Sequence, residues 1–174
     1  WLQDVPSVME VWYPGQAQGT AVAGLLYGDI NPSGKLPVTF PASDAQAAEV
    51  AQPSPFSLIT QVSPVVPYSE GVFVGYKEYV SRGLTPLFPF GHGLSYSSFS
   101  YGNLQATPLV DASDPAAEVS VQVRNLGTRT GEETVQVYVG NLPGDVPTPA
   151  RQLAGFGSVT LPPGGIGTVT IALD

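Results

Sequence analysis

Apolar and polar residues alternate along much of the second half of the chain. Residues 118–124, 134–139 and 167–173 each place an apolar residue at every second position. Because successive side chains of a strand point to opposite faces, each segment predicts a strand with one buried and one solvated face. Residues 152–159 predict a weaker strand. The side chains expected to share one core are Val119, Val121, Val123, Val135, Val137, Val139, Val169 and Ile171.

Turn-forming residues separate these strands. Asn125-Leu126-Gly127 follows the first of them, and Pro162-Pro163-Gly164-Gly165 precedes the last. Glycine, proline and asparagine are the residues that tight turns require. Several short strands with turns between them are typical of an antiparallel β-sandwich. The second half of the chain is therefore predicted to be all-β.

The first half has a different pattern. Residues 8–13 are apolar and β-prone and end at Pro14-Gly15, which predicts a buried strand. Apolar residues at spacings of three and four over residues 16–27 predict a helix packed on a sheet, with Gly28 as its C-cap. A strand, a tight turn and a helix make half of a βαβ unit, so this half is predicted to be α/β.

The pattern is less regular further along. Residues 31–34 predict a turn and residues 36–40 a second short strand. Residues 42–67 have little periodicity and predict a long surface loop. Residues 72–79 alternate and predict another strand.

A segment rich in proline, glycine and aromatic residues joins the two halves. Pro86 and Pro89 exclude a regular helix or central strand, and the glycines at 91 and 93 permit unusual backbone angles. The rings of Phe88, Phe90 and Tyr96 nevertheless require burial. Residues 86–96 are therefore predicted to form a fixed, buried corner. The expected organisation is an α/β segment over 1–85, a connecting corner over 86–103 and a β-sandwich over 104–174.

Charge and composition argue against several classes of partner and binding site. A net charge of −8 disfavours nucleic acid and anionic membranes as partners. The chain has no cysteine, so it has no disulfide or thiolate metal site, and no apolar run approaches the length of a membrane span. Both ends lie within patterned elements, and we expect a piece of a longer protein.

Few residues are candidates for chemistry. Glu70 is a weak candidate for a general acid, but it stands alone in the sequence. The adjacent acids Glu132-Glu133 would point to opposite faces of a strand. His92 is the single histidine, which gives a metal site or a catalytic triad little support. An ion pair between Asp29 and Lys35 is the simplest expectation for that turn. The glycines at 15 and 19 lack the spacing of a nucleotide-binding loop.

Several motifs occur in the order seen in one enzyme family. They are Trp12-Tyr13-Pro14-Gly15-Gln16, Tyr27-Gly28-Asp29-Ile30-Asn31-Pro32-Ser33-Gly34-Lys35-Leu36-Pro37, Tyr68-Ser69-Glu70-Gly71 with Gly75-Tyr76, the corner from Pro86 to Tyr96, and Arg151-Gln152-Leu153-Ala154-Gly155-Phe156. The ordered set resembles the C-terminal region of family 3 glycoside hydrolases, which include β-glucosidases. This resemblance covers essentially the whole chain.

The resemblance implies the end of an α/β-sandwich domain followed by a fibronectin-III-like domain, both incomplete. It implies part of a retaining enzyme that hydrolyses terminal β-linked sugars without a cofactor or metal. It places the nucleophilic aspartate on an N-terminal (β/α)₈ barrel and the acid/base glutamate upstream of the matched region. No residue of this chain is therefore assigned a catalytic role, and the chain alone is expected to be inactive. Its partners would be the barrel, the rest of the α/β domain and a glycoside or oligosaccharide substrate. A secreted bacterial enzyme is favoured.

Two other interpretations stay open. A carbohydrate-binding or adhesive module would need an aromatic platform on the sandwich, yet after Tyr101 the aromatic residues are Tyr138 and Phe156. A structural spacer domain would explain the sandwich but not the α/β half.

Overall fold

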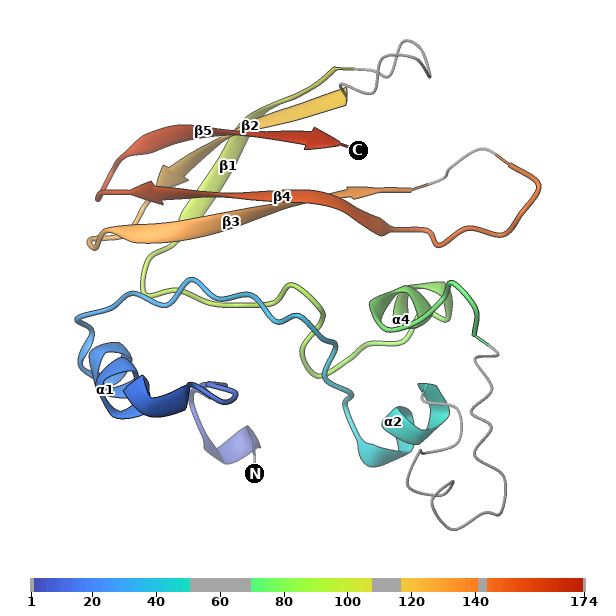
Figure 1. Cartoon of the computed structure of the whole chain (residues 1–174), viewed down its shortest axis with the longest axis horizontal. Coiled ribbons are helices and arrows are strands. Elements are labelled where there is room, and N and C mark those ends of the chain that lie inside the picture. Colours follow the sequence, from blue (N-terminus) through green and yellow to red (C-terminus); the bar gives the residue numbers. More distant parts are fainter. Residues whose placement is uncertain (1, 51–69, 108–116, 141–143, 174) are drawn as a thin grey trace.

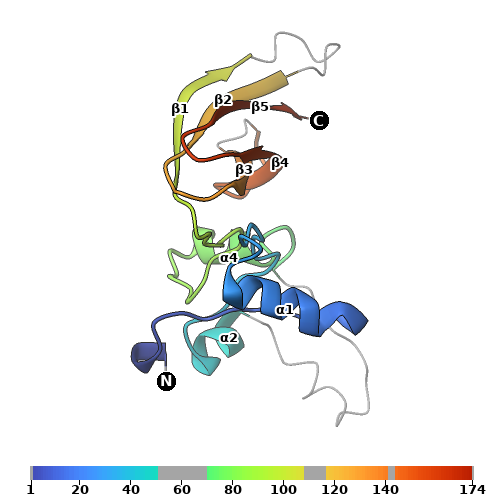
Figure 2. The same ribbon diagram turned by 90° about the vertical axis from the view of Figure 1, so that its left-hand side faces the viewer.

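The computed structural model describes residues 2–50, 70–107, 117–140 and 144–173. Two parts are evident: a β-sandwich from the second half of the chain and a helical part from the first half (Figure 1). In the perpendicular view the sandwich lies above the helical part, and β1 runs down to the segment that connects them (Figure 2). The predicted combination of an α/β-type segment and an all-β sandwich is confirmed.

The sandwich has a sheet of three strands facing a sheet of two. β1 (Phe99–Ala106), β2 (Ala117–Asn125) and β5 (Ile166–Leu173) form the first sheet, in the order β1-β2-β5. β3 (Gly131–Val139) and β4 (Gln152–Leu161) form the second. All neighbouring strands are antiparallel. The strands predicted over 118–124, 134–139, 152–159 and 167–173 are all present.

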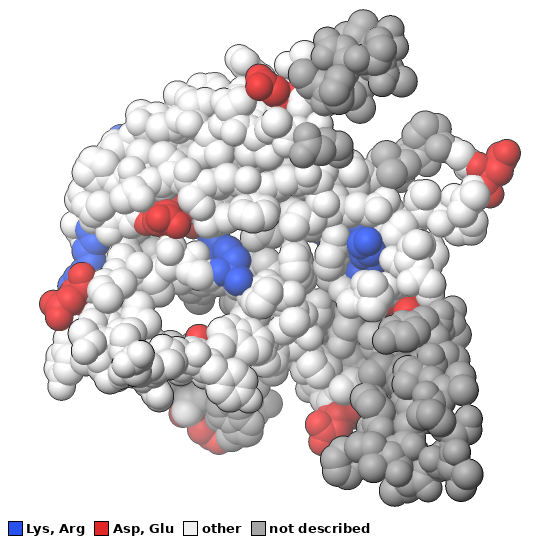
Figure 3. Space-filling model, in the orientation of Figure 1, with Lys and Arg blue, Asp and Glu red and all other residues white. Residues whose placement is uncertain are grey.

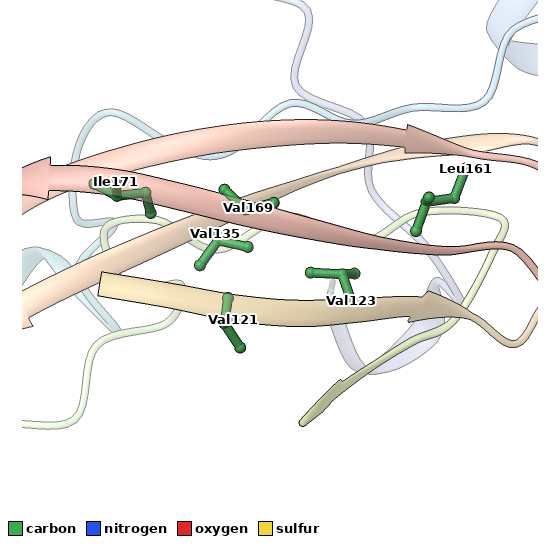
Figure 4. Packing of buried hydrophobic residues seen from close by; sticks show 6 residues of the cluster. All are labelled: Val121, Val123, Val135, Leu161, Val169 and Ile171. Atoms are coloured by element: carbon green, nitrogen blue, oxygen red, sulfur yellow. The ribbon is translucent and has the colours of Figure 1, made fainter. Parts of the chain in front are cut away.

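The core lies between the two sheets (Figure 4). Burial alternates along β2, where Val123 is 0% exposed and Arg124 next to it is exposed. Burial of a valine or isoleucine contributes about 1.5–3 kcal/mol. Val119, Val137 and Val139 are only partly buried, although Val137 packs against the core. Leu161, which the pattern did not include, joins the core. The central residues are Val121, Val123, Val135, Leu161, Val169 and Ile171.

Two glycines explain why β4 has a weak sequence pattern. A Cβ atom added at Gly155 would lie 2.6 Å from a methyl of Ile171, and one added at Gly157 would lie 2.9 Å from Val169. Both glycines therefore face the opposite sheet and allow it to approach closely. Two of the core-facing positions of β4 are therefore glycines instead of apolar residues, so hydrophobic periodicity underestimates the strand.

β1 is a strand that the pattern did not predict. It is irregular because the register with β2 shifts between Gly102 and Gln105, and Asn103 has a positive φ of 50°. Such a bulge interrupts the two-residue period. The ring of Phe99, at the start of the strand, packs against the core.

The described residues of the helical part form five short helical elements. They are η1 (Leu2–Asp4), η2 (Gly15–Ala17), α1 (Gln18–Tyr27), α2 (Asp44–Val50) and α4 (Tyr76–Ser81). The predicted helix over 16–27 is confirmed by η2 and α1. Gly28 caps it in the left-handed conformation, and its N–H donates to the carbonyl of Leu25 at 3.1 Å. None of the described helices is long and apolar enough to cross a membrane.

The predicted strand over residues 8–13 is wrong. These residues have no regular secondary structure, Trp12 has a positive φ of 47° and Tyr13 is 98% exposed. A strand requires a neighbour for its backbone groups, and no described residue pairs with this segment. The expected packing of α1 on a sheet is also wrong, because no described strand of this part lies against it. Leu26 and Tyr27 of α1 are accordingly 67% and 85% exposed.

The strand predicted over residues 72–79 is also wrong, because α4 begins at Tyr76. Gly75 precedes it with a φ of 61°, a conformation that interrupts an extended chain. The loop predicted over 42–67 contains α2, whose start is marked by Ser43 and Gln46. The Ser43 hydroxyl accepts from the Gln46 N–H at 3.2 Å, and Gln46 Oε1 accepts from the Ala42 N–H, in the manner of a capping box. Residues 51–67 lie outside the described residues.

Residues 31–40 differ from the prediction as well. No turn is present at 31–34, and residues 36–40 form a single bridge, Phe40 to Phe88, instead of a regular strand. The reason is that this segment pairs with the proline-containing corner, which cannot supply a continuous ladder of N–H donors.

Candidate functional site

The corner lies along the segment that precedes α2. The N–H of Leu36 donates to the carbonyl of His92 at 2.8 Å, and the Gly91 N–H donates back to Leu36 at 2.8 Å. The N–H of Phe40 donates to the carbonyl of Phe88, also at 2.8 Å. Gly91 has a φ of +78°, a conformation that favours glycine. The corner is thus fixed by backbone hydrogen bonds, as predicted from its composition.

The aromatic residues of the corner extend into both parts of the molecule. Phe90 stacks on Tyr76 of α4 with ring centroids 4.7 Å apart, and Tyr76 meets Tyr138 of β3 edge-on at 5.9 Å. Phe88 contacts Phe40 at 6.3 Å and His92 at 5.4 Å. Pairs of this geometry contribute about 0.5–1.5 kcal/mol beyond area burial.

The prediction that the rings of Phe88, Phe90 and Tyr96 are buried needs correction. Phe88 and Phe90 are half-buried, and Tyr96 is 47% exposed. Tyr96 lies at the surface because its hydroxyl donates to the carbonyl of Leu25 at the end of α1, at 2.8 Å. It therefore positions the helix through a polar contact instead of filling a core.

Asn31 connects the two parts through four hydrogen bonds. Its amide group donates to Ser97 Oγ at 3.2 Å and to the carbonyl of Thr130 at 3.0 Å. Its Oδ1 accepts from Ser95 Oγ and from the Tyr96 N–H, both at 2.8 Å. One side chain from the helical part thus contacts both the corner and the β2–β3 connection. The sequence contains no signal for this role.

A second contact between the parts is an ion pair. Lys35 Nζ lies 3.2 Å from Glu133 Oε2 and donates to the carbonyl of Gly93 at 3.0 Å. The hydroxyl of Tyr101 donates to the other oxygen of Glu133. Burial, followed by the hydrogen bond and negative charge of Glu133, raises the pKa of Tyr101. Lys35 binds Glu133 of β3 and not Asp29, so the expected pair across the turn is wrong.

Arg129 completes these contacts. Its guanidinium donates to the carbonyl of Gly28, at the end of α1. Its own carbonyl accepts from Ser97 Oγ at 2.9 Å and from the amide of Asn125 at 2.8 Å. Asn125 is fully buried and also donates to the carbonyl of Leu161 at 2.9 Å. The cations Lys35, Arg129 and Arg151 therefore all lie at the boundary between the two parts, where Figure 3 shows basic residues.

The structure does not gather the sequence candidates into one site. Glu70 lies in the turn before α4, and one carboxylate oxygen is buried without a hydrogen-bond partner among the described residues. His92 is stacked on Phe88 within the corner. Glu132 is exposed and Glu133 buried, which confirms that adjacent strand residues face opposite ways. The glycines at 15 and 19 lie in η2 and the first turn of α1. The described residues contain no cluster of three or more potential metal ligands.

A cleft is present at the boundary. Its volume is about 340 Å³, and it lies between the corner and α4 on one side and β3 and β4 on the other. Its lining residues are Thr39, Tyr76, Tyr79, Val80, Leu84, Pro86, Pro89, Phe90, Gln136, Tyr138 and Arg151. Of these, Tyr76, Arg151 and the corner residues belong to the motifs noted in the sequence. Gln136 and Thr39 carry no sequence signal, because isolated polar residues have no distinctive spacing.

Comparisons with known proteins agree with the arrangement. Residues 1–76 match the glycosyl hydrolase family 3 C-terminal domain, and residues 133–174 match the fibronectin type III-like domain. The thermostable β-glucosidase B of Acetivibrio thermocellus is 42% identical over 174 residues, which are 100% of this chain and 22% of that protein. A β-glucosidase of Rhizobium radiobacter is 38% identical over 99% of this chain and 21% of its own length.

Solved structures give the same result. DesR, a β-glucosidase from Streptomyces venezuelae in complex with D-glucose, superposes with a TM-score of 0.80 and 40% identity over 94% of this chain and 20% of that one. The β-glucosidase of Kluyveromyces marxianus superposes with a TM-score of 0.82 and 36% identity, over 99% of this chain and 20% of its own. The chain thus spans about a fifth of the length of these relatives. With both domain matches in order and the fold shared, the chain belongs to glycoside hydrolase family 3 and corresponds to its C-terminal α/β and fibronectin-III-like region.

Proposed function

We propose that this chain is the C-terminal structural portion of a retaining β-glucosidase that hydrolyses terminal non-reducing β-linked glucose. The observation that carries the proposal is the 42% identity to a β-glucosidase over all 174 residues. Fold alone does not specify function, but the match covers all 174 residues and therefore spans the positions that join the two parts. Asn31 and Lys35, which make those contacts, lie within the motifs shared with the family.

In this proposal the chain's role is to hold two domains in a fixed relation. The sequence predicts 1–85 as the end of the α/β domain, 86–103 as the corner and 104–174 as the sandwich, and we propose this division with the corner ending before β1, because Phe99–Ala106 pairs with β2 in the sandwich. The exposed apolar residues of the helical part form the surface on which the rest of the enzyme, including a (β/α)₈ barrel, packs. An exposed apolar patch of this kind typically marks an interface. Its main members are Val8, Met9, Trp12, Tyr13, Leu26, Tyr27 and Ile30.

The catalytic pair is proposed to lie outside this chain. A retaining glycosidase requires a nucleophile and an acid/base about 5–5.5 Å apart. The acids of this chain with described contacts serve its structure instead: Glu133 binds Lys35, Glu78 binds Arg82, Glu132 accepts from the Thr160 hydroxyl and Glu10 accepts from the Trp12 N–H. We therefore propose that Glu70 is not catalytic.

A chimera tests the proposal. In the Acetivibrio thermocellus enzyme, the segment that matches this chain would be replaced by this chain, and hydrolysis of 4-nitrophenyl β-D-glucoside would be measured. We expect activity in the chimera, none in the relative without the segment, and none in this chain alone. The product anomer, followed by NMR, should retain its configuration. An inactive but folded chimera would contradict the proposal.

Glu70→Gln in the same chimera tests the assignment of the catalytic pair. We expect the turnover number to change by less than about tenfold, because removal of a general acid typically costs about 10²–10⁴-fold. A loss in that larger range, with the folded structure retained, would make Glu70 catalytic.

A further inference from the structure

Four exposed apolar residues lie where α1, the corner and the β2–β3 connection meet. Leu26 and Tyr27 form the end of α1, and Tyr96 belongs to the corner. Leu126 lies between β2 and β3 and is 57% exposed. We call these four residues the junction surface. Leu26 and Tyr27 belong to the surface assigned above to the rest of the enzyme, whereas Leu126 belongs to the sandwich.

Hydrogen bonds hold the three elements against one another. The Tyr96 hydroxyl donates to the carbonyl of Leu25 in α1 at 2.8 Å. The Arg129 guanidinium, from the β2–β3 connection, donates to the carbonyl of Gly28, directly after Tyr27. In Figure 1, α1 and the β2–β3 connection lie on the same side of the molecule. The junction surface therefore lies next to contacts that already join the two parts.

The turn between β2 and β3 holds Leu126 in a fixed position. The Leu126 N–H donates to the carbonyl of Ser98 at 2.8 Å. On either side of it, Asn125 is fully buried and its Oδ1 accepts from the Gly127 N–H at 2.8 Å. The backbone is thus fixed while the apolar side chain is exposed. Because a preorganised residue loses less conformational freedom when it is covered, Leu126 is suited to an interface.

The composition and charge of the junction surface favour one kind of partner. Two leucines and two tyrosines present apolar area, and exposed apolar patches mark interfaces. A second copy of this chain fits poorly, because each copy has a net charge of −8 and like-charged copies repel one another. The chain spans 22% of the Acetivibrio thermocellus β-glucosidase, so most of such an enzyme lies outside it. Another part of the same polypeptide is therefore the favoured partner.

We propose that the junction surface is covered by the N-terminal part of the same enzyme, which thereby contacts the sandwich directly at Leu126. The identity of this partner rests on the proposed function. That function requires contacts only with the helical part, and the junction surface adds the sandwich to the interface. The N-terminal part then fixes the relative position of the two parts from outside, in addition to Asn31 and Lys35 within the chain.

The accessibility of single cysteines tests the proposal, because the chain has no cysteine of its own. Leu126→Cys is compared with Leu104→Cys, the matched control, whose site on β1 of the same sandwich is 71% exposed and lies outside the junction surface. The rate of alkylation by N-ethylmaleimide is measured by peptide mass spectrometry, in this chain alone and in the chimera described above. We expect Leu126→Cys to react at least about tenfold more slowly in the chimera, and Leu104→Cys to react equally in both.

A photo-crosslinker identifies the partner. In the chimera, Leu126→p-benzoylphenylalanine should crosslink to peptides of the N-terminal part. Crosslinks to a second copy, or only within the segment that this chain supplies, would overturn the proposal. Equal alkylation of Leu126→Cys in the chain and the chimera would also overturn it, as would an equal slowing at Leu104→Cys. If Leu126→Cys fails to fold, Tyr96→Cys probes the same surface with the same expected protection.

The outcomes separate this inference from the proposed function. A chimera that hydrolyses the glucoside but leaves position 126 unprotected retains the proposed function and overturns the inference. A chimera that folds and protects position 126 but does not hydrolyse the glucoside supports the inference and contradicts the proposed function.

Discussion

The sandwich and the helical part differ in how much of their apolar surface they bury within the described residues. The sandwich buries a shared cluster of valine, leucine and isoleucine between its own two sheets. In the helical part, Tyr79 is the one large apolar residue that is fully buried among the described residues, while Tyr13 and Tyr27 are 98% and 85% exposed. Burial of apolar area is the main stabilising contribution to folding. The comparison therefore teaches that the sandwich contains its own core, whereas the helical part requires contacts with other segments.

The largest effect should come from the sandwich core. Ile171→Ala empties a site that is 4% exposed, and we expect a loss of about 2–5 kcal/mol in the free energy of unfolding. Val72→Ala, at a site 57% exposed in the helical part, should change it by less than about 0.5 kcal/mol. Urea denaturation of both variants measures the contrast. Equal losses would mean that the two parts do not differ as described.

The contact between the parts should come next. Glu133→Gln removes the charge that binds Lys35. Breaking a buried pair on one side costs about 3–5 kcal/mol, and because this pair is 16% and 11% exposed we expect a loss at or somewhat below the lower end of that range. Glu132→Gln, the adjacent exposed residue, is the matched control and should cost less than about 0.5 kcal/mol. The same denaturation measurement applies. If both variants lose the same stability, the ion pair does not join the two parts.

Alkaline pH should weaken the same contact. The pKa of Tyr101 is raised in the folded chain, so its stabilising contribution is complete below the unfolded value of about 10 and falls as the pH rises above it. Tyr101→Phe lacks this group and should show a smaller loss of stability between about pH 9 and pH 11. Thermal unfolding at several pH values measures the difference. Parallel curves for the two proteins would contradict the assigned cause.

The smallest effect should come from Tyr96. Tyr96→Phe removes the hydrogen bond to the carbonyl of Leu25 but leaves a site that water can reach. We expect a loss of about 0.5–1 kcal/mol, since a solvent-accessible acceptor is rehydrated. Thermal unfolding of the variant checks the value, and a loss as large as that of Ile171→Ala would mean that the ring is part of a core.

The same contrast explains what the sequence predicts well. Residues such as Val121 and Val169 are buried by their own sandwich, so the period of two correctly identified three strands and most of the core, while β4 was predicted only as a weaker strand. Residues 8–13 have a similar apolar content, but the segments that would bury them are not among the described residues, and the predicted strand was wrong. The local pattern of apolar residues indicates that a segment must be buried, but it does not identify the segment that buries it.

The polar contacts between the parts were largely beyond sequence reasoning. Lys35 and Glu133 are 98 residues apart, and the partners of Asn31 lie up to 99 residues away. Single polar residues have no period that would relate such distant positions. The corner was recognised because proline, glycine and aromatic residues are concentrated within eleven positions, which is a local signal. Glu70 has no local signal of this kind, so the proposal that it is not catalytic relies on family resemblance and not on pattern.

The hydrogen bonds between the two parts also limit how sandwiches can be exchanged among relatives. Lys35 of the helical part pairs with the opposite charge of Glu133 in the sandwich. The other two contacts each pair an N–H donor with a backbone carbonyl: Asn31 donates to Thr130, and Arg129 donates to Gly28. A foreign sandwich spliced at the corner would keep the covalent connection but lose these partners unless it carried equivalent residues at the β2–β3 connection and the start of β3. Exchange between relatives should therefore succeed in proportion to agreement at these few positions, even where overall identity is low.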